Sequence, residues 1–462
     1  MTNSEDQEQN AVLNEEYKIW KKAVPVLYSH ITTYKPLLSE PLNASGENTV
    51  PKKGQELCTF TFENILAPVV EQANSGVCSS TVYYSRGKTL YSFDVNLPQG
   101  LLTQDTSLIS PISVPSATAL KLTNEYKVIS TNDKHEYVKI KKLPQHQLLS
   151  LDTGNNLTWN HCVSKNVSMT YECENTGAPV TDFEIYKTEM IATSSGEIID
   201  YKTAKQLSNL KIPQGVFASV HTQQQAPRFK NTNELVYINN DGTQLLSADT
   251  RASTASTSPV INYSKTADYT PNSKFTCFDH SHLAETLFVT GSTDGLIKVW
   301  DSRMATTPVH TLFHTQNENS TSAGVSKIQF KPNSPMEFLS VCADYGFIYQ
   351  WNLEPLVNYQ QSLAARPAED ADEMEITELD NEELNSRCLK YVHTSGSRRK
   401  RSKTVSKLEN QTTNSSGSMG SAEKRQIMLN QCEWNPYMDD VVGCLDNDGT
   451  LVVYKGWFGQ QK

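Results

Sequence analysis

The chain has 462 residues, a formal net charge of −10 at pH 7 and an isoelectric point near 5.6. An acidic surface excludes general duplex binding through phosphates, which needs a basic face, and it suits a partner that is itself basic. We expect an intracellular protein without membrane contact. No signal peptide opens the chain, and no apolar run approaches the roughly 18–20 residues of a membrane helix.

The chain is expected to begin with a short tail followed by a helix. Residues 1–12 are polar and acidic, which predicts a disordered acidic tail. Residues 13–34 carry apolar side chains mostly at helical steps, which predicts an amphipathic helix that docks a partner. We expect the partner contacts from five residues of this helix: Glu15, Glu16, Tyr17, Trp20 and Tyr28. The simpler interpretation is a helix packed on the side of the protein, which does not exclude binding.

A segment after a polar linker, Leu57–Ile65, alternates apolar and polar residues and is expected to be a strand. We expect it to be an outer strand that closes the fold onto the last strands of the chain. Closure of this kind removes an open sheet edge.

The rest of the chain repeats a strand–turn–strand pattern. Six of the turns contain glycine, as tight hairpins require: Gly87, Gly196, Gly242, Gly295, Gly346 and Gly449. A seventh turn, without glycine, is expected near Asp133. The middle four glycines are spaced by close to the roughly 40–45 residues of a propeller repeat. We therefore predict an all-β, seven-bladed β-propeller with an N-terminal α-helix, in which residues 55–359 hold the closing strand and six blades and residues 427–457 hold the last blade.

The clearest repeat is Gly291–Arg303, which reads G-S-T-D-G-L-I-K-V-W-D-S-R. Its Trp-Asp ending is typical of a WD-repeat blade. Only Trp300 and Trp351 occupy this blade-ending position. We therefore expect apolar packing to replace most of the His–Ser–Asp–Trp hydrogen-bond network of such blades.

Residues 360–426 show almost no strand alternation and are expected to form one charged, largely disordered insertion before the last blade. The insertion holds a run of acidic residues: Glu369, Asp370, Asp372, Glu373, Glu375, Glu378, Asp380, Glu382 and Glu383. One hypothesis is that this acidic loop and the N-terminal helix form a groove for a basic amphipathic helix. The other is a solvated loop, as most charge runs are.

A basic cluster follows in a Ser- and Thr-rich stretch of the same insertion: Arg398, Arg399, Lys400, Arg401 and Lys403. Such clusters serve as nuclear import signals or contact nucleic acid. A flexible solubilising segment is the alternative. We favour nuclear import, because one basic patch beside many acids makes a poor duplex-binding surface.

Three short motifs carry a resemblance to a known family. Residues 14–22 read N-E-E-Y-K-I-W-K-K, Val95–Pro98 reads V-N-L-P, and Cys432–Pro436 reads C-E-W-N-P. Together with the acidic insertion, these resemble the retinoblastoma-binding, Msi-type histone-binding propellers, and most of all the fungal WTM branch of WD-repeat transcriptional modulators. In one departure, the chain reads Y-K-P-L-L at residues 34–38, where the family normally has Trp-Pro-Ser-Leu.

The resemblance implies a nuclear, non-catalytic scaffold subunit of a histone deacetylase corepressor complex that represses transcription, including that of meiotic genes. The implied partners are the other subunits of that complex and core histones. Three alternatives stay open: a histone-binding chaperone of chromatin assembly, a nuclear anchor for another protein, and a substrate receptor of a cullin-type ubiquitin ligase. The last starts from the W-D-S-R ending at Trp300–Arg303, which is also a common blade ending.

No catalytic, metal or cofactor motif appears in the sequence, so we expect neither an enzyme nor a cofactor. His280 and His282 lie close together, but no Cys or carboxylate cluster accompanies them at zinc-type spacing. Positions in a blade strand or loop are the expected interpretation.

Overall fold

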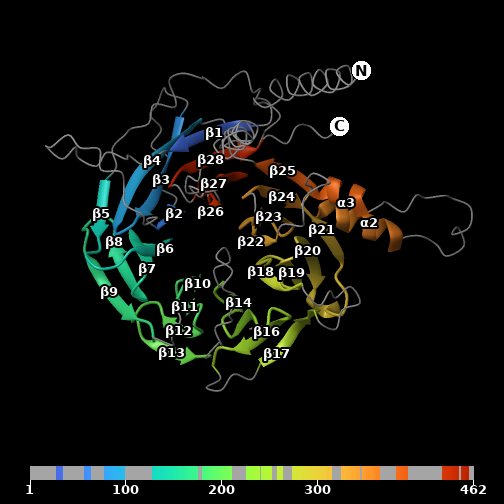
Figure 1. Ribbon diagram of the computed structural model, residues 1–462, viewed down its shortest axis with the longest axis horizontal. Helices are drawn as coiled ribbons and strands as arrows, with labels where there is room; N and C mark the ends of the chain where they lie inside the picture. The colour runs from blue at the N-terminus through green and yellow to red at the C-terminus, as the bar shows by residue number, and fades with distance from the viewer. Residues whose placement is uncertain are drawn as a thin grey trace, which may run out of the picture.

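The computed structural model describes residues 28–34, 57–63, 77–98, 127–174, 179–210, 225–239, 241–251, 257–263, 273–314, 324–343, 346–364, 381–393, 429–436, 438–446 and 449–456. The strands in these ranges form seven four-stranded antiparallel sheets. Figure 1 shows the sheets arranged as blades around a ring, each with one strand near the centre and one at the rim. The prediction of a seven-bladed β-propeller is confirmed.

The first three blades follow one another along the chain. Blade 1 contains β2 (Cys58–Phe62), β3 (Val77–Arg86), β4 (Thr89–Pro98) and β5 (Lys127–Thr131). Blade 2 contains β6 (Tyr137–Leu143), β7 (Gln147–Asp152), β8 (Asn156–His161) and β9 (Val167–Glu172). Blade 3 contains β10 (Phe183–Tyr186), β11 (Met190–Thr193), β12 (Glu197–Asp200) and β13 (Gln206–Asn209). The four strands of each blade are called a to d from the centre outward.

The other four blades complete the ring. Blade 4 contains β14 (Arg228–Asn231), β15 (Glu234–Ile238), β16 (Gln244–Asp249) and β17 (Thr257–Asn262). Blade 5 contains β18 (Phe275–His280), β19 (Leu287–Ser292), β20 (Leu296–Asp301) and β21 (His310–Phe313), with the short 3-10 helix η4 (Ser302–Met304) after β20. Blade 6 contains β22 (Val325–Phe330), β23 (Glu337–Cys342), β24 (Ile348–Asn352) and β25 (Leu389–His393). Blade 7 contains β26 (Leu429–Trp434), β27 (Val441–Asp446), β28 (Leu451–Gly456) and β1 (Tyr28–Tyr34).

Each blade turns from strand b to strand c through a residue with positive φ. The six predicted turn glycines all take this role, with φ between 55° at Gly87 and 91° at Gly196. The seventh expected turn was wrong, because Asp133 lies in the connection between blades 1 and 2. Blade 2 turns instead at Asn155, which has φ 63°. Asparagine tolerates this left-handed conformation better than most residues, so it replaces glycine there.

The ring closes through β1, which was predicted to be helical. Tyr28–Tyr34 pairs antiparallel with β28, from Tyr28 opposite Gly456 to Tyr34 opposite Leu451. Tyr28 therefore lies on a strand and not on the predicted helix. The helical steps of the sequence were misleading here, because the unpaired edge of β28 offers a full row of backbone partners. The helix predicted over residues 13–27 lies outside the described residues.

The strand expected to close the ring has a different place. Residues Cys58–Phe62 form β2, the innermost strand of blade 1, and all five are buried. An outer strand would expose one face to solvent, whereas an inner strand is covered by both neighbouring blades. The prediction of a strand in this segment is confirmed. The prediction that this strand is the outer strand of the last blade is wrong.

The insertion lies partly inside blade 6. After β24 the chain forms α2 (Glu354–Ala364) and α3 (Asn381–Cys388), and then returns as β25, the outer strand of the same blade. The expected single insertion between two blades is therefore corrected, because residues 389–393 complete the sixth sheet. Neither of these helices is long and apolar enough to cross a membrane.

Blades 5 and 6, which hold the two blade-ending tryptophans, keep part of the hydrogen-bond network that we expected apolar packing to replace in most of the propeller. Trp300 donates its indole N–H to Thr290 Oγ1 at 2.9 Å, and Trp351 donates to Ser340 Oγ at 2.9 Å. His314 Nε2 lies 2.8 Å from the same Ser340 Oγ. Two blades thus keep the hydroxyl–indole bond of a regular WD repeat.

Candidate functional site

The inner strands are joined to one another by polar side chains around the ring. Thr59 donates to Gln431 at 2.7 Å between blades 1 and 7. Lys142 and Glu63 form an ion pair at 3.0 Å between blades 2 and 1. Trp434 donates to the carbonyl of Gln329 at 3.3 Å between blades 7 and 6. The first and third of these contacts tie the closing blade to both of its neighbours.

Blades 2 to 6 are joined by charged groups. Glu184 pairs with Lys141 at 2.9 Å and with Arg228 of the next blade. Arg228 also faces Asp279, whose carboxylate accepts the backbone N–H of Phe330 at 2.8 Å. Burial alone would raise the pKa of Glu184, but the neighbouring cations hold it well below its ordinary value. Every blade junction therefore has a polar contact near the centre, which favours a rigid ring.

The paired inner strands run in the same direction, which defines two faces. Thr59 and Thr61 face Gln431 and Glu433 in that order, as parallel neighbours must. All b–c turns then lie on one face, and the a–b and c–d connections lie on the other. We call these the b–c face and the c–d face.

The start of β1 and the α2–α3 insertion lie on the same face of neighbouring blades. The insertion is the c–d connection of blade 6. In blade 7, β1 starts opposite Gly456, at the end of strand c, so this strand begins on the face that carries the c–d connections. Figure 1 shows β1, β25 and the two helices along one sector of the ring. This sector of blades 6 and 7 on the c–d face is the candidate site.

An ion network links blades 6 and 7 within this sector: Lys331, Glu337, Lys390, Asp439, Asp440 and Lys455. Lys331 Nζ lies 2.8 Å from Glu337 Oε2 and 2.9 Å from Asp440 Oδ1, with its side chain 7% exposed. Burial would lower the pKa of Lys331, but the surrounding carboxylates raise it above its ordinary value. Lys455 is in register with His30 of β1, so this network borders the closing strand.

The helix pair is anchored to blade 5 as well as to blade 6. Asn385 of α3 is fully buried, and its side-chain oxygen accepts the backbone N–H of Phe313 in β21 at 2.9 Å. Leu384 and Cys388 are buried on the same helix. Helix α3, with Glu382 and Glu383 in its first turn, is therefore held at a fixed place on the rim.

Few of the predicted site residues fall in the described residues. Glu382 and Glu383 lie exposed in the first turn of α3, and Glu383 pairs with Arg387 at 2.6 Å. Tyr28 is at the start of β1. The remaining predicted contacts lie outside the described residues: Glu15, Glu16, Tyr17, Trp20, Glu369, Asp370, Asp372, Glu373, Glu375, Glu378, Asp380, Arg398, Arg399, Lys400, Arg401 and Lys403.

Sequence reasoning missed the ion network and Asn385. These residues are far apart in the chain and have no common motif, so only the pairing of blades 6 and 7 brings them together. The one available signal was the Asp439–Asp440 pair just before a predicted strand.

The histidine pair has no metal-site geometry. His280 ends β18, is buried, and stacks on Phe288 with ring centroids 5.6 Å apart. Burial lowers the pKa of His280 to about 4, so its ring is neutral near pH 7. Over the described ranges, no group of three or more His, Cys, Asp or Glu side chains could hold a metal ion.

Three yeast proteins are similar to this chain over nearly its whole length. The transcriptional regulatory protein UME1 of Saccharomyces cerevisiae is 26% identical, with 98% of this chain and 96% of the relative covered. The transcriptional modulators WTM1 and WTM2 of the same yeast are 25% and 24% identical, covering 95% and 94% of this chain. The chain is a relative of the yeast WTM-type transcriptional modulators. The similarity to the WTM-type proteins covers both the segment before β1 and the last blade that β1 completes.

Family models and solved structures give no second relationship beside the one to the WTM-type proteins. No protein-family model matches the chain. A chain in a crystal structure of the mitotic checkpoint complex covers 91% of this chain with a TM-score of 0.49 and 11% sequence identity. The propeller assignment rests on the seven sheets themselves.

Proposed function

We propose that the protein is a non-catalytic scaffold subunit of a nuclear histone deacetylase corepressor complex, which represses transcription, including that of meiotic genes. Its WTM-type relatives carry the names of transcriptional regulators and modulators. A rigid ring with projecting segments suits assembly of other proteins, because a preformed surface loses little conformational entropy on binding.

The observation that carries the proposal is that the start of β1 and the α2–α3 insertion lie on the same face of blades 7 and 6. The N-terminal segment holds Tyr17 and Trp20, which are residue types that often dominate binding energy. The insertion supplies carboxylates, of which Glu382 and Glu383 are already exposed on the anchored helix α3. Aromatic side chains would bind the apolar face of a basic amphipathic segment of a partner, and carboxylates would bind its cationic face.

The site would work by docking and not by reaction. The ion network around Lys331 fixes blade 6 against blade 7, and Asn385 fixes α3 against blade 5. A partner that touches both the N-terminal segment and the insertion therefore meets two elements on one rigid base. Preorganisation of this kind increases affinity.

The decisive experiment is affinity isolation of the full chain followed by mass spectrometry. Deacetylase subunits should be the dominant co-purifying proteins, and Tyr17→Ala with Trp20→Ala should release them while the propeller still melts cooperatively. The matched control is Leu57→Ala with Val128→Ala, two exposed apolar residues of blade 1 that lie away from the c–d face. Dominant recovery of core histones, of one abundant enzyme or of a cullin adaptor would instead support the corresponding alternative.

The acidic run needs its own test. Exchange of its carboxylates for amides should weaken binding of purified core histones or basic peptides and flatten the salt dependence of that binding. A control with Glu172→Gln and Glu285→Gln removes charge from other blades. Unchanged binding in the acidic-run variant would show that the run is a solvated loop without a role in binding.

Nuclear import is proposed for the basic cluster at residues 398–403. A fluorescent fusion of the full chain should be nuclear, with the cytoplasm as a second location. Replacement of the five cationic residues by alanine should shift it to the cytoplasm. An unchanged nuclear signal would reject this role for the cluster.

A further inference from the structure

The exposed apolar side chains are concentrated on the c–d face. The described residues hold seven exposed large hydrophobic side chains, and five of them are at or next to this face: Val163, Val167, Leu207, Leu283 and Met304. Exposed apolar side chains that gather on one face mark an interaction surface more often than scattered ones do. Three of the five lie on blades 3 and 5, away from the candidate site on blades 6 and 7.

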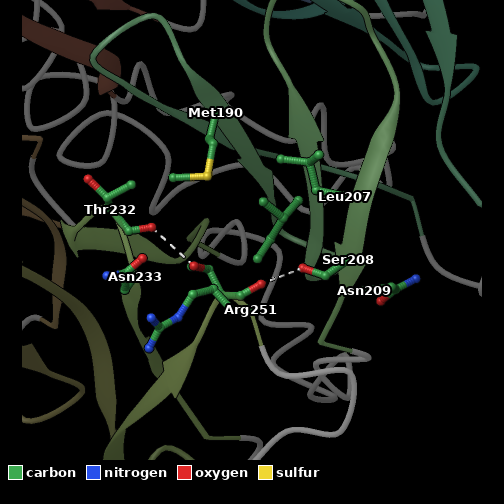
Figure 2. Close-up of a pocket in the computed structure, with 9 residues that line it drawn as sticks. Met190, Leu207, Ser208, Asn209, Thr232, Asn233 and Arg251 are labelled. Carbon is green, nitrogen blue, oxygen red and sulfur yellow. Dashed lines mark hydrogen bonds between the residues drawn. The ribbon is translucent and has the colours of Figure 1, made fainter.

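A groove of about 560 Å³ lies between blades 3 and 4 at this face. Its apolar lining residues are Met190, Ile198 and Leu207. Figure 2 shows Arg251 across the groove from Met190 and Leu207. Leu207 is 55% exposed. Figure 2 also shows Ser208 donating to the carbonyl of Thr250, a bond of 3.0 Å that joins the two blades across the groove.

Arg251 has a counterpart in the next blade with the same local geometry. Asp249 accepts the backbone N–H, Nε and Nη2 of Arg251, and Asp301 accepts the same three groups of Arg303. Each arginine begins a c–d connection, and the side chains are 68% and 74% exposed. The aspartate occupies the Nε–Nη2 edge of each guanidinium. The N–H groups on the Nη1 side of these exposed side chains can therefore donate to a carboxylate of a partner.

Apolar groups adjoin the second arginine too. Met304 follows Arg303 directly in η4 and is 67% exposed, and Leu283 of the a–b connection is 59% exposed. The backbone N–H of Ser302 donates to the carbonyl of Thr286 at 2.8 Å, which joins these two connections of blade 5. Blades 4 and 5 thus repeat one arrangement, an oriented guanidinium beside exposed apolar side chains.

We infer that blades 3 to 5 of the c–d face form a second docking surface, which binds an extended protein segment carrying both carboxylates and apolar side chains. Arginine binds carboxylates through two parallel hydrogen bonds. The aspartates already hold each arginine side chain in one conformation, so little side-chain entropy is lost when a partner binds. The apolar groups of the segment would enter the groove beside Leu207 and cover Leu283 and Met304. This surface differs from the candidate site in place and in the charge of its partner.

The test begins with a phage-displayed random peptide library panned on the full-length protein. Counter-selection uses the Arg251→Ala, Arg303→Ala double variant, so that only peptides dependent on these arginines are kept. The enriched peptides should combine acidic with apolar residues. Enrichment of basic or uncharged peptides, or no enrichment at all, would overturn the inference.

Fluorescence anisotropy with the most enriched peptide then measures how much the arginines and the apolar side chains of the surface each contribute to Kd. The double alanine variant should raise Kd by about tenfold and reduce the salt dependence, and Arg251→Lys with Arg303→Lys should recover only part of the affinity. Leu283→Ser with Met304→Ser should also weaken binding. Lys134→Ala on the d–a connection of blade 1, an exposed cation on the b–c face, should leave Kd unchanged. Equal losses in Lys134→Ala, or an unchanged Kd in the arginine variants, would reject the surface.

Discussion

Asn385 accepts the backbone N–H of Phe313 at 2.9 Å, and this bond joins a helix inserted in blade 6 to the outermost strand of blade 5. The edge of an outer strand is normally open to solvent. Here a fully buried amide occupies it and holds α3, which carries the last two residues of the acidic run, Glu382 and Glu383.

Asn385→Ala is expected to free α3 from the ring. The change leaves a partly buried backbone N–H without its acceptor, which costs about 1 kcal/mol. Hydrogen exchange at Phe313 and along α3 should become faster, while exchange in blade 2 stays the same. Unaltered protection at Phe313 would show that the bond does not anchor the helix.

Lys331→Met should destabilise the junction of blades 6 and 7. The variant removes the more buried of the two cations that Glu337 and Asp440 share and leaves only Lys390 beside them. We expect this to reduce the free energy of unfolding by about 2–4 kcal/mol. Urea unfolding followed by tryptophan fluorescence measures the change. Arg387→Ala removes an exposed pair of α3 and should cost below about 0.5 kcal/mol. Similar values for the two variants would contradict the assigned burial of Lys331.

Two N-terminal truncations separate ring closure from partner binding. Removal of residues 1–34 deletes β1 and exposes the edge of β28, so the melting temperature should fall by about 10 °C and aggregation should increase. Removal of residues 1–27 keeps β1 and should leave the melting temperature nearly unchanged. Equal stability of the two truncations would show that β1 adds nothing to closure.

The buried histidines should make the fold sensitive to mild acid. Burial lowers the pKa of His314 to about 3 and that of His280 to about 4, against 6.5 as the ordinary value. The unfolded chain then binds more protons than the folded chain between these values and 6.5. The free energy of unfolding therefore falls as the pH drops below 6.5.

The matching measurement is urea unfolding over a pH series. His314→Gln should give a shallower decline below pH 6.5 than the wild type, and His280→Gln should add to that effect because it is a separate site. A decline of equal slope in all three proteins would show that other groups cause it.

The hairpin turns were predictable because their requirement is local. Gly295 follows Asp294 between two alternating runs, and a positive φ favours glycine whatever surrounds it. Asn155 meets the same requirement with a side chain that is common in many other loops, so the turn of blade 2 escaped detection. The Trp300 ending likewise marks its blade by itself.

The candidate site was less accessible to sequence reasoning, since its parts meet only in space. Lys331 and Asp440 belong to different blades. Arg251 and Arg303 follow an aspartate in the same way, but the shared motif is recognised only when both c–d connections are known to lie on one face.

The sequence by itself determined the repeat, the number of blades and most b–c turns, because each depends on residues a few positions apart. Tertiary structure alone decided which strand closes the ring. Tyr28–Tyr34 has aromatic and β-branched residues that suit a strand as well as a helix face, and the open edge of β28 selects the strand. The same long-range pairing places β1 in the blade next to the one that carries the α2–α3 insertion, which no local pattern specifies.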